Sequence, residues 1–423
     1  MAIREHTLGN GLEIIAEVNE RAYSAAFGFF VRAGSRDETL ELSGVSHFLE
    51  HMVFKGTANR SADQVNRELD EIGSQSNAYT SEEQTVFYAA VLPEYQDRTI
   101  ELLADMMRPA LRPDDFETEK QVILEEIAKY DDQPPFGAFE KALDYHFAGH
   151  ALGRNILGSV KSVSDLQVGP MQRYFDHHYC PRNMTLVASG NLNFDRLVRR
   201  AETYCGNWED VAASHDPQRT SRVVSHLSVS AHTHELATQQ YVVLVSDAPA
   251  VDDTMRFAAR VLATIIGDDS GSRMFWELVD TGLADVAAMG PHEYEGTGVC
   301  LTYLCCQGDA VTENLAAIQR ILETSERDGI TSQELEQAVN KISSQIVLSS
   351  ERPMSRLHAV GSSWLSRREY TTVRETVGRY RNVTLDDLHE VLKRFPYSRY
   401  SAVAVGPNGD VKWPAKPSPI GHD

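Results

Sequence analysis

Two histidines and a glutamate form the group of side chains in this sequence best suited to chemistry. They occur within His47-Phe48-Leu49-Glu50-His51. On a helix, residues four apart lie about 40° apart on one face, so both imidazoles can reach a single metal ion. Glu50 flanks the same face, where its carboxylate can contact a metal-bound water. The spacing therefore predicts a metal site with Glu50 as general base, and a helix with two surface histidines is the alternative.

A later helix offers the third ligand that a catalytic zinc ion needs beside an open position for water. One stripe of this helix contains Glu119, Val122, Ile123 and Glu126. Carboxylates within an apolar stripe are costly to bury unless a cation compensates them. Glu125 points to another side, so Glu126 is the predicted ligand. Glu119 would orient a ligand or tune the water, unless it only complements the helix dipole.

The surrounding segments predict the helices and strands that hold these residues. Strands are expected at residues 12–18, 25–31 and 183–190, with strand composition across 77–92 and an Asn10-Gly11 hairpin turn near the start. Helices are expected at residues 45–54, 61–72, 95–107 and 113–130. The two histidines and Glu50 would then lie on the first of these helices, and Glu126 on the fourth.

The second half of the sequence repeats the first in outline. A strand at 240–245, a helix at 332–348 and a strand at 402–406 each follow a similar segment about 215 residues earlier. A polar, aperiodic stretch between the halves predicts a linker at 213–225. The expected fold is α+β, with homologous domains at 1–212 and 226–423. Each domain would have a mainly antiparallel sheet with helices packed on one face.

Composition limits the partners that the chain could have. The 423 residues carry a net charge of −21, which argues against nucleic acid and favours cationic partners. The apolar runs are too short to span a bilayer, and the first residues have no apolar or Arg-rich leader, so a cytoplasmic protein with no membrane partner is expected. Reduced thiols are expected at all five cysteines, which form no C-x-x-C pair: Cys180, Cys205, Cys300, Cys305 and Cys306.

The motif at 47–51, followed by Met52-Val53-Phe54-Lys55-Gly56-Thr57, resembles the insulinase/pitrilysin (inverzincin) metallopeptidases. Within that family it is similar to the bacterial processing-protease-like branch, which is related to the β subunit of the mitochondrial processing peptidase. Residues 119–127 resemble the family's third-ligand helix, where the second glutamate of the pair binds zinc. The resemblance thus implies one Zn²⁺ per chain, held by His47, His51 and Glu126, and a processing-peptidase-like fold.

Two further implications of the resemblance concern substrate. Residues 77–85 are similar to the family's substrate-binding edge strand, which assigns substrate binding to Asn77, Ala78 and Tyr79. A peptide or unfolded segment would pair with this edge in an extended conformation. The predicted function is therefore zinc-dependent endopeptidase activity, with a mild preference for basic peptides suggested by the acidic balance.

One departure from the family pattern lies in the second half. Many relatives carry an Arg and a Tyr seven residues apart, with the Tyr after Gly-Leu-Ala. Here Asp285 follows the Gly-Leu-Ala, and Leu278 stands seven residues earlier. Arg273 or Tyr294 could replace the pair, although structural roles are expected for both.

The departure leaves other functions open. The chain could be an inactive or partner-dependent scaffold subunit of the same family, or a zinc-binding module without hydrolytic activity. In the resembling family, four repeats of the α+β domain enclose the zinc site, and this chain supplies two. A homodimer is therefore expected, with a heterodimer containing an inactive family member as the alternative.

Overall fold

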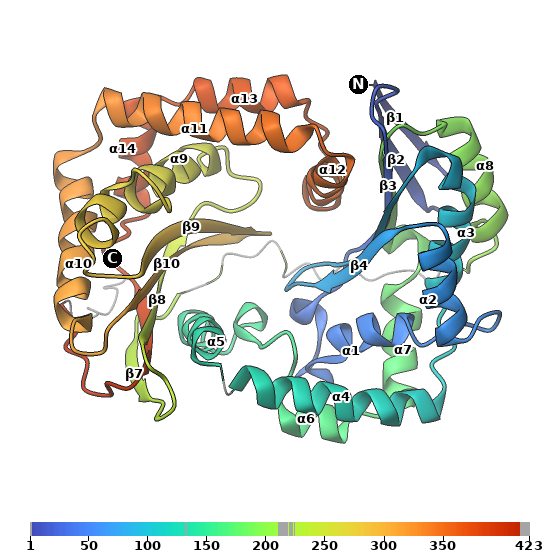
Figure 1. The fold of residues 1–423 in the computed structure, drawn as a ribbon, viewed down its shortest axis with the longest axis horizontal. Coiled ribbons are helices and arrows are strands. Elements are labelled where there is room, and N and C mark those ends of the chain that lie inside the picture. The colour runs from blue at the N-terminus through green and yellow to red at the C-terminus, as the bar shows by residue number, and fades with distance from the viewer. Residues whose placement is uncertain (1, 132, 210–218, 220–222, 224, 415–423) are drawn as a thin grey trace. The chain divides into compact units, whose positions relative to one another are not determined.

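The computed structural model describes residues 2–131, 133–209, 219, 223 and 225–414 and contains two compact units (Figure 1). Unit 1 comprises Met1–Ile127, Arg154–Asp216 and Val347–Thr371. Unit 2 comprises Ala128–Gly153, Pro217–Ile346 and Thr372–Asp423. Each unit therefore takes a segment from the opposite half of the chain, which the predicted domains 1–212 and 226–423 do not include. Most of the predicted linker, 213–225, lies outside the described residues.

The sheet of unit 1 has six strands in the order β1-β2-β6-β3-β5-β4. Only β2 and β6 are parallel; the other neighbours are antiparallel, so the sheet is mixed but mainly antiparallel, as predicted. The strands are β1 Ala2–Thr7, β2 Glu13–Val18, β3 Ala25–Val31, β4 Gln75–Thr80, β5 Thr85–Val91 and β6 Met184–Gly190. The predicted strand segment 77–92 is thus a hairpin, and β4 forms one edge of the sheet.

The sheet of unit 2 has five strands in the order β7-β11-β8-β10-β9, of which only β7 and β11 are parallel. The strands are β7 Val229–Thr233, β8 Gln240–Ala248, β9 Val286–Tyr294, β10 Thr297–Cys306 and β11 Ser401–Gly406. Two α+β units with mainly antiparallel sheets confirm the predicted fold class.

Most helices of unit 1 cover one face of its sheet, and α12 covers the other. The strand β3 explains this arrangement, because Phe27 and Phe29 belong to the main core while Phe30 packs with Leu357 and Val360 of α12. The helices are α1 Val45–Val53, α2 Ala62–Glu71, α3 Gln96–Met106, α4 Pro113–Asp131, α6 Val160–Asp165, α7 Val168–His178, α8 Phe194–Cys205 and α12 Pro353–Arg367. The prediction that helices cover one face of the sheet is therefore incomplete, because α12 covers the other face.

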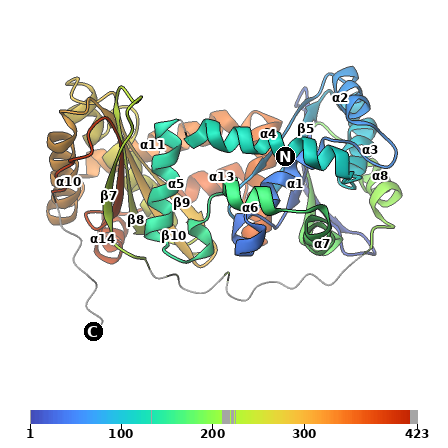
Figure 2. The same cartoon turned by 90° about the horizontal axis from the view of Figure 1, so that it is seen from below.

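Unit 2 repeats this arrangement with α5, which packs against β8 and β11 (Figure 2). Ala138 and Ala142 of α5 contact a layer that includes Val243 and Val403. The helices are α5 Pro134–His146, α9 Arg256–Gly267, α10 Val311–Asp328, α11 Ser332–Ser350, α13 Val373–Arg381 and α14 Leu385–Arg394. Among the described residues, no helix has the length and apolar character needed to cross a membrane.

A buried ion pair fixes α12 on unit 1. The guanidinium of Arg356 donates to both carboxylate oxygens of Glu17 on β2, at 2.8 and 2.5 Å. The hydroxyl of Tyr370 donates to the same carboxylate at 2.7 Å. Glu17 is 1% exposed, so this carboxylate depends on these donors for its hydrogen bonds.

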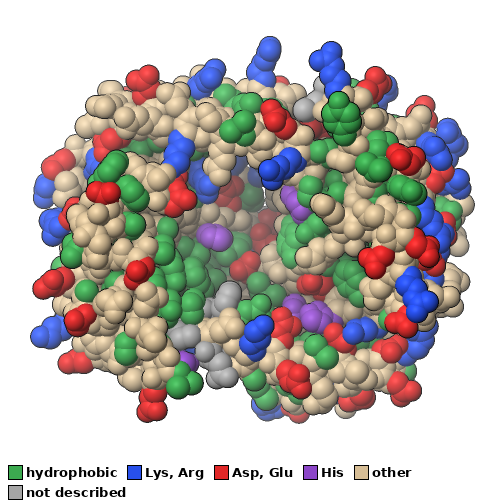
Figure 3. Space-filling model, in the orientation of Figure 1, with side chains coloured by type: hydrophobic (Ala, Val, Ile, Leu, Met, Phe, Trp, Pro, Cys, Tyr) green, Lys and Arg blue, Asp and Glu red, His purple; other side chains and the backbone are tan. Residues whose placement is uncertain are grey.

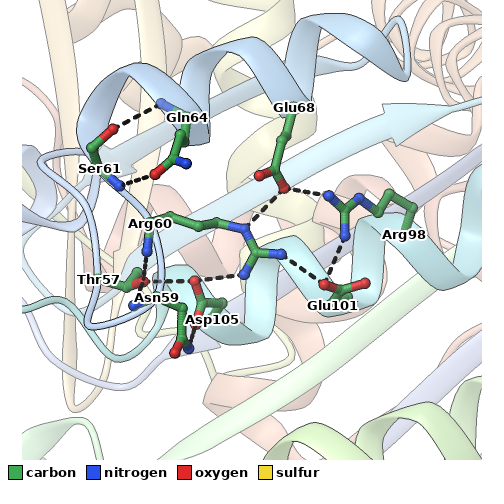
Figure 4. A network of polar contacts seen from close by, with 9 residues as sticks. All are labelled: Thr57, Asn59, Arg60, Ser61, Gln64, Glu68, Arg98, Glu101 and Asp105. Atoms are coloured by element: carbon green, nitrogen blue, oxygen red, sulfur yellow. Dashed lines mark hydrogen bonds and ion pairs between the residues drawn. The ribbon is translucent and has the colours of Figure 1, made fainter.

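A second polar network ties the segment after α1 to α2 and α3 (Figure 4). Arg60 forms ion pairs with Glu68 of α2 and with Glu101 and Asp105 of α3. Arg98 bridges Glu68 and Glu101 from the other side. The segment that follows α1 is therefore held to α2 and α3 by several charges acting together.

Candidate metal centre

The helix α1 begins with an unusual cap. The carboxylate of Glu38 accepts hydrogen bonds from the backbone N–H groups of Gly44 and Ser46, both at 2.8 Å. These are N–H groups that an α-helix leaves without partners at its N-terminus. Glu38 is 4% exposed, and burial raises its pKa to about 8 despite the hydrogen bonds that lower it. An acid in the segment that leads into α1 thus fixes the start of the helix that carries the predicted ligands.

Core packing then orients α1 and brings α4 beside it. Phe48 of α1 stacks on Phe116 of α4 with ring centroids 4.6 Å apart. Ile123 and Ile127 bury the same side of α4 in the core of unit 1. His47 is itself 8% exposed, so the site lies against the core rather than on a solvated helix face. The alternative of two surface histidines does not describe this arrangement.

The structure brings His47, His51 and Glu126 together. The Oε2 atom of Glu126 is 3.6 Å from Nε2 of His51 and 3.9 Å from Nε2 of His47. One possible ligand atom from each residue lies within 4.8 Å of the others. Zinc bonds of about 2.0–2.2 Å set donor atoms roughly 3–4 Å apart, so these separations suit donors to a single ion. The exposed Glu125 is not part of this group.

The hydrogen bonds of His51 leave the appropriate nitrogen for a metal. Its Nδ1 lies 2.7 Å from Oε1 of Glu119, and Lys55 pairs with the other oxygen of that carboxylate at 2.5 Å. A carboxylate partner on Nδ1 favours the tautomer in which Nε2 carries a lone pair. Glu119 therefore contacts a predicted ligand, as the sequence suggested, and Lys55 supports it from the turn after α1.

The electrostatics of the two imidazoles differ. Burial, followed by the neighbouring His51, lowers the pKa of His47 to about 3, so its ring is neutral, as a metal ligand must be. Burial also lowers the pKa of His51, but the hydrogen bond and charge of Glu119 outweigh it and raise the pKa overall. Burial raises the pKa of Glu119, but the hydrogen bonds and charges of His51 and Lys55 outweigh it, so the pKa is lowered overall. This carboxyl group therefore stays ionised beside His51.

Glu50 lies beside the ligand group without belonging to it. Thr80, the last residue of β4, donates its hydroxyl to Oε2 of Glu50 at 2.7 Å. Burial raises the pKa of Glu50, and Thr80 opposes this shift. A raised pKa makes this carboxylate a stronger base, which suits a group that must accept a proton. Sequence reasoning missed Thr80, although strand alternation places it on the same face as Ala78.

The predicted substrate-binding residues lie on the edge strand β4. The N–H of Ala78 donates to the side-chain oxygen of Asn77 at 2.9 Å. Tyr79 points to the α12 side, where its ring centroid is 5.7 Å from that of His358 and its hydroxyl accepts from Gln84 at 3.2 Å. These residues therefore stand at a sheet edge close to Glu50, and their contact with a substrate stays a prediction.

Arg273 and Tyr294, the possible substitutes for the missing Arg/Tyr pair, both make contacts within unit 2. Arg273 binds Glu334 through two hydrogen bonds, at 2.7 and 3.0 Å. Tyr294 is 5% exposed in the core beside β8. Leu278 is buried in the other core of this unit, and Asp285 accepts a hydrogen bond from Gln239. The structural roles expected for Arg273 and Tyr294 agree with these contacts.

The cysteines are buried, and the charges on the visible surface are mixed in sign. On the face shown in Figure 3, acidic and basic side chains are interspersed among the coloured residues. All five cysteines are free and buried, as expected. The exclusion of nucleic acid, which followed from net charge, stays a prediction.

Comparisons with known proteins give consistent similarities. Residues 13–160 match the insulinase family (peptidase family M16), and residues 165–342 match the M16 inactive domain. An uncharacterized zinc protease of Mycobacterium tuberculosis is 31% identical over 415 residues, which cover 97% of this chain and 94% of the relative. An uncharacterized zinc protease of Bacillus subtilis is 29% identical over 411 residues, covering 97% and 99%. The three candidate ligands and Glu50 lie within the first matched segment.

Solved structures share the fold. A protease from Helicobacter pylori aligns with a TM-score of 0.88 at 20% identity, covering 96% of this chain and 99% of that chain. A peptidase M16 inactive domain from Pseudomonas fluorescens aligns with a TM-score of 0.89 at 14% identity, covering 98% and 100%. At these identities the similarity establishes the fold alone.

Proposed function

Because the chain belongs to the insulinase family of peptidases, we propose that it is a zinc-dependent endopeptidase acting on peptides or unfolded segments. Family membership confirms the resemblance drawn from the motifs at 47–57 and 119–127. The observation that carries the proposal is the convergence of donors from His47, His51 and Glu126 within 4.8 Å. These three residues would hold one zinc ion.

The chain's own groups can perform the proton transfers of hydrolysis. A bound zinc ion would polarise the scissile carbonyl and make a water acidic enough to attack it. The carboxylate of Glu50 would accept the proton of that water and pass it to the leaving amine. The products are then a carboxylate and an amine, with water consumed. Glu119 and Lys55 would keep His51 oriented throughout.

The edge strand β4 supports a preference for extended substrates. A peptide added alongside β4 would gain main-chain hydrogen bonds, while side-chain pockets would set sequence preference. A folded protein cannot offer such a strand without local unfolding. We therefore expect faster cleavage of an unfolded protein than of its folded form, and equal rates would contradict pairing at this edge.

The direct test combines metal analysis with hydrolysis of an internally quenched peptide. The purified chain is expected to contain about one zinc ion, lose activity with a chelator and regain it when zinc is restored. Hydrolysis that persists after zinc has been removed would contradict the proposal. A zinc-loaded chain that cleaves no peptide would favour the scaffold or the zinc-binding module.

Leu278 and Asp285, which stand at the positions of the family's Arg/Tyr pair, favour a chain that needs a partner for activity. Neither Arg273 nor Tyr294 offers a free replacement for the family's Arg/Tyr pair, because both are engaged within unit 2. We propose that two copies of the chain act together, with a heterodimer as the second possibility. An active species near twice 47.2 kDa in light scattering supports the homodimer. Activity that requires a different subunit supports the heterodimer, and a fully active monomer contradicts both.

A further inference from the structure

The last residue of the edge strand β4 contacts Glu50, the proposed general base. Thr80 directs its hydroxyl to Glu50 at 2.7 Å, and its backbone N–H also acts on the same carboxylate. The N–H of Ala78, two residues earlier, donates to the side chain of Asn77. Because N–H groups two residues apart in a strand point to the same side, both lie on the side of β4 away from β5.

The tip of the β4–β5 hairpin is held rigidly enough to make this contact specific. The N–H of Ser81 bonds to the carbonyl of Gln84 at 2.8 Å and closes the turn. The N–H of Arg36 bonds to the carbonyl of Glu82 at 2.8 Å. Gly34 packs so closely that an added Cβ would collide with the carbonyl oxygen of Ser81. The backbone next to Thr80 is therefore held by contacts that do not involve Glu50.

We infer that Thr80 is a positioning residue that holds the Glu50 carboxylate in line for proton transfer. The inference rests on the proposed peptidase function. The two residues on the open edge of β4 would then have different roles. The N–H of Ala78 would bind an extended substrate after the side chain of Asn77 has moved away from it. Thr80 would hold Glu50. A substrate strand paired at Ala78 would then end beside Glu50, which places its next peptide bond at the reacting group.

The kinetic test uses Thr80→Val, which keeps the shape of the side chain and removes the donor. We expect kcat to fall by about 10- to 100-fold with KM and zinc content unchanged, because a misaligned base loses part of its usual contribution. Thr80→Ser should restore most of the rate. Thr203→Val, the same change at an exposed threonine of α8 whose hydroxyl donates to the carbonyl of Arg199, is the matched control and should behave as wild type.

Several results would overturn the inference. A wild-type kcat in Thr80→Val would do so, as would an equal loss in Thr80→Ser. The rates of Glu50→Gln and of Glu50→Gln combined with Thr80→Val should coincide, since both changes act on one group; multiplied losses would contradict this. Failure of the proposed function is recognised separately, because the wild-type chain would then show no chelator-sensitive hydrolysis.

A second measurement tests the contact without hydrolysis. Thermal unfolding of the zinc-free chain is compared for wild type, Thr80→Val, Glu50→Leu and the double variant. Coupled effects on the unfolding midpoint are expected if the two side chains interact in solution. Additive effects would show that Thr80 does not hold Glu50, whatever the enzyme assay gives.

Discussion

The choice between two adjacent glutamates rests on the face of α4 that each occupies. Glu126 lies 3.6 Å from His51, whereas Glu125 is exposed and belongs to no donor group among the described residues. Glu126→Gln should therefore lose most of the bound zinc in metal analysis, because a neutral amide is a poor ligand for a dication. Glu125→Gln is the matched control and should retain it. Full zinc occupancy in Glu126→Gln would remove this residue from the site.

The Glu38 cap predicts a pH-dependent contribution to stability. Its pKa in the folded chain is about 8, above the ordinary value of 4.5, so the folded state holds this proton more tightly than the unfolded state. The corresponding stability is complete below pH 4.5 and is lost as the pH rises through about 8. The loss should be on the order of a few kcal/mol.

Glu38→Gln tests this directly, because its side chain does not titrate. The unfolding temperature of the zinc-free variant, relative to wild type, should rise between about pH 5 and about pH 8.5. Glu20→Gln, an exposed substitution, should show no such trend. A difference between Glu38→Gln and wild type that stays constant with pH would show that this carboxyl group titrates normally.

The helices of the site could be predicted closely from the sequence. The β4–β5 turn and the contacts between segments far apart in the chain could not. The predicted helices at 45–54 and 113–130 correspond to Val45–Val53 and Pro113–Asp131. Both have periodic apolar positions and residues that mark their ends. The turn between β4 and β5 contains no Gly, Pro or Asn, so the segment 77–92 gave no sign of a hairpin.

The contacts of Glu38 and the docking of α12 lie beyond such patterns. Glu38 caps a helix across a loop, and Arg356 pairs with Glu17 from 339 positions away. Local periodicity contains no information about which distant segments meet. The two predicted domains therefore followed the order of the chain, whereas the compact units exchange the segments 128–153 and 347–371.

The ion pair between Arg356 and Glu17 should stabilise the packing of α12 on unit 1. Arg356→Met leaves the carboxylate of Glu17 buried without its main partner, which should destabilise unit 1 by about 3–5 kcal/mol. Combining it with Glu17→Leu should recover much of the loss, because neither charge is then buried alone. Unfolding temperatures measure both effects. Arg352→Met, at an exposed position of the same segment, is the control, and an equal effect there would contradict a specific role for the pair.

The whole chain consists of two related units, of which one carries the candidate metal ligands. The described donors His47, His51 and Glu126 all belong to unit 1, as do Glu50 and the edge strand β4. Unit 2 repeats the layered arrangement, and the match to the M16 inactive domain at 165–342 covers most of its segment Pro217–Ile346, together with part of unit 1. In the proposed mechanism, Glu50 acts as base at a zinc ion that the three donors would hold.

The role of Glu50 is tested by measuring zinc content and peptide hydrolysis on the same sample of Glu50→Gln. Because Glu50 is not one of the clustered donors, the variant should bind about one zinc ion per chain, like wild type. Its kcat should fall by at least about 100-fold, because the amide cannot accept the proton of the attacking water. A zinc-loaded variant that hydrolyses peptide at the wild-type rate would contradict the assignment of Glu50. A variant that has lost its zinc would instead make this residue a ligand.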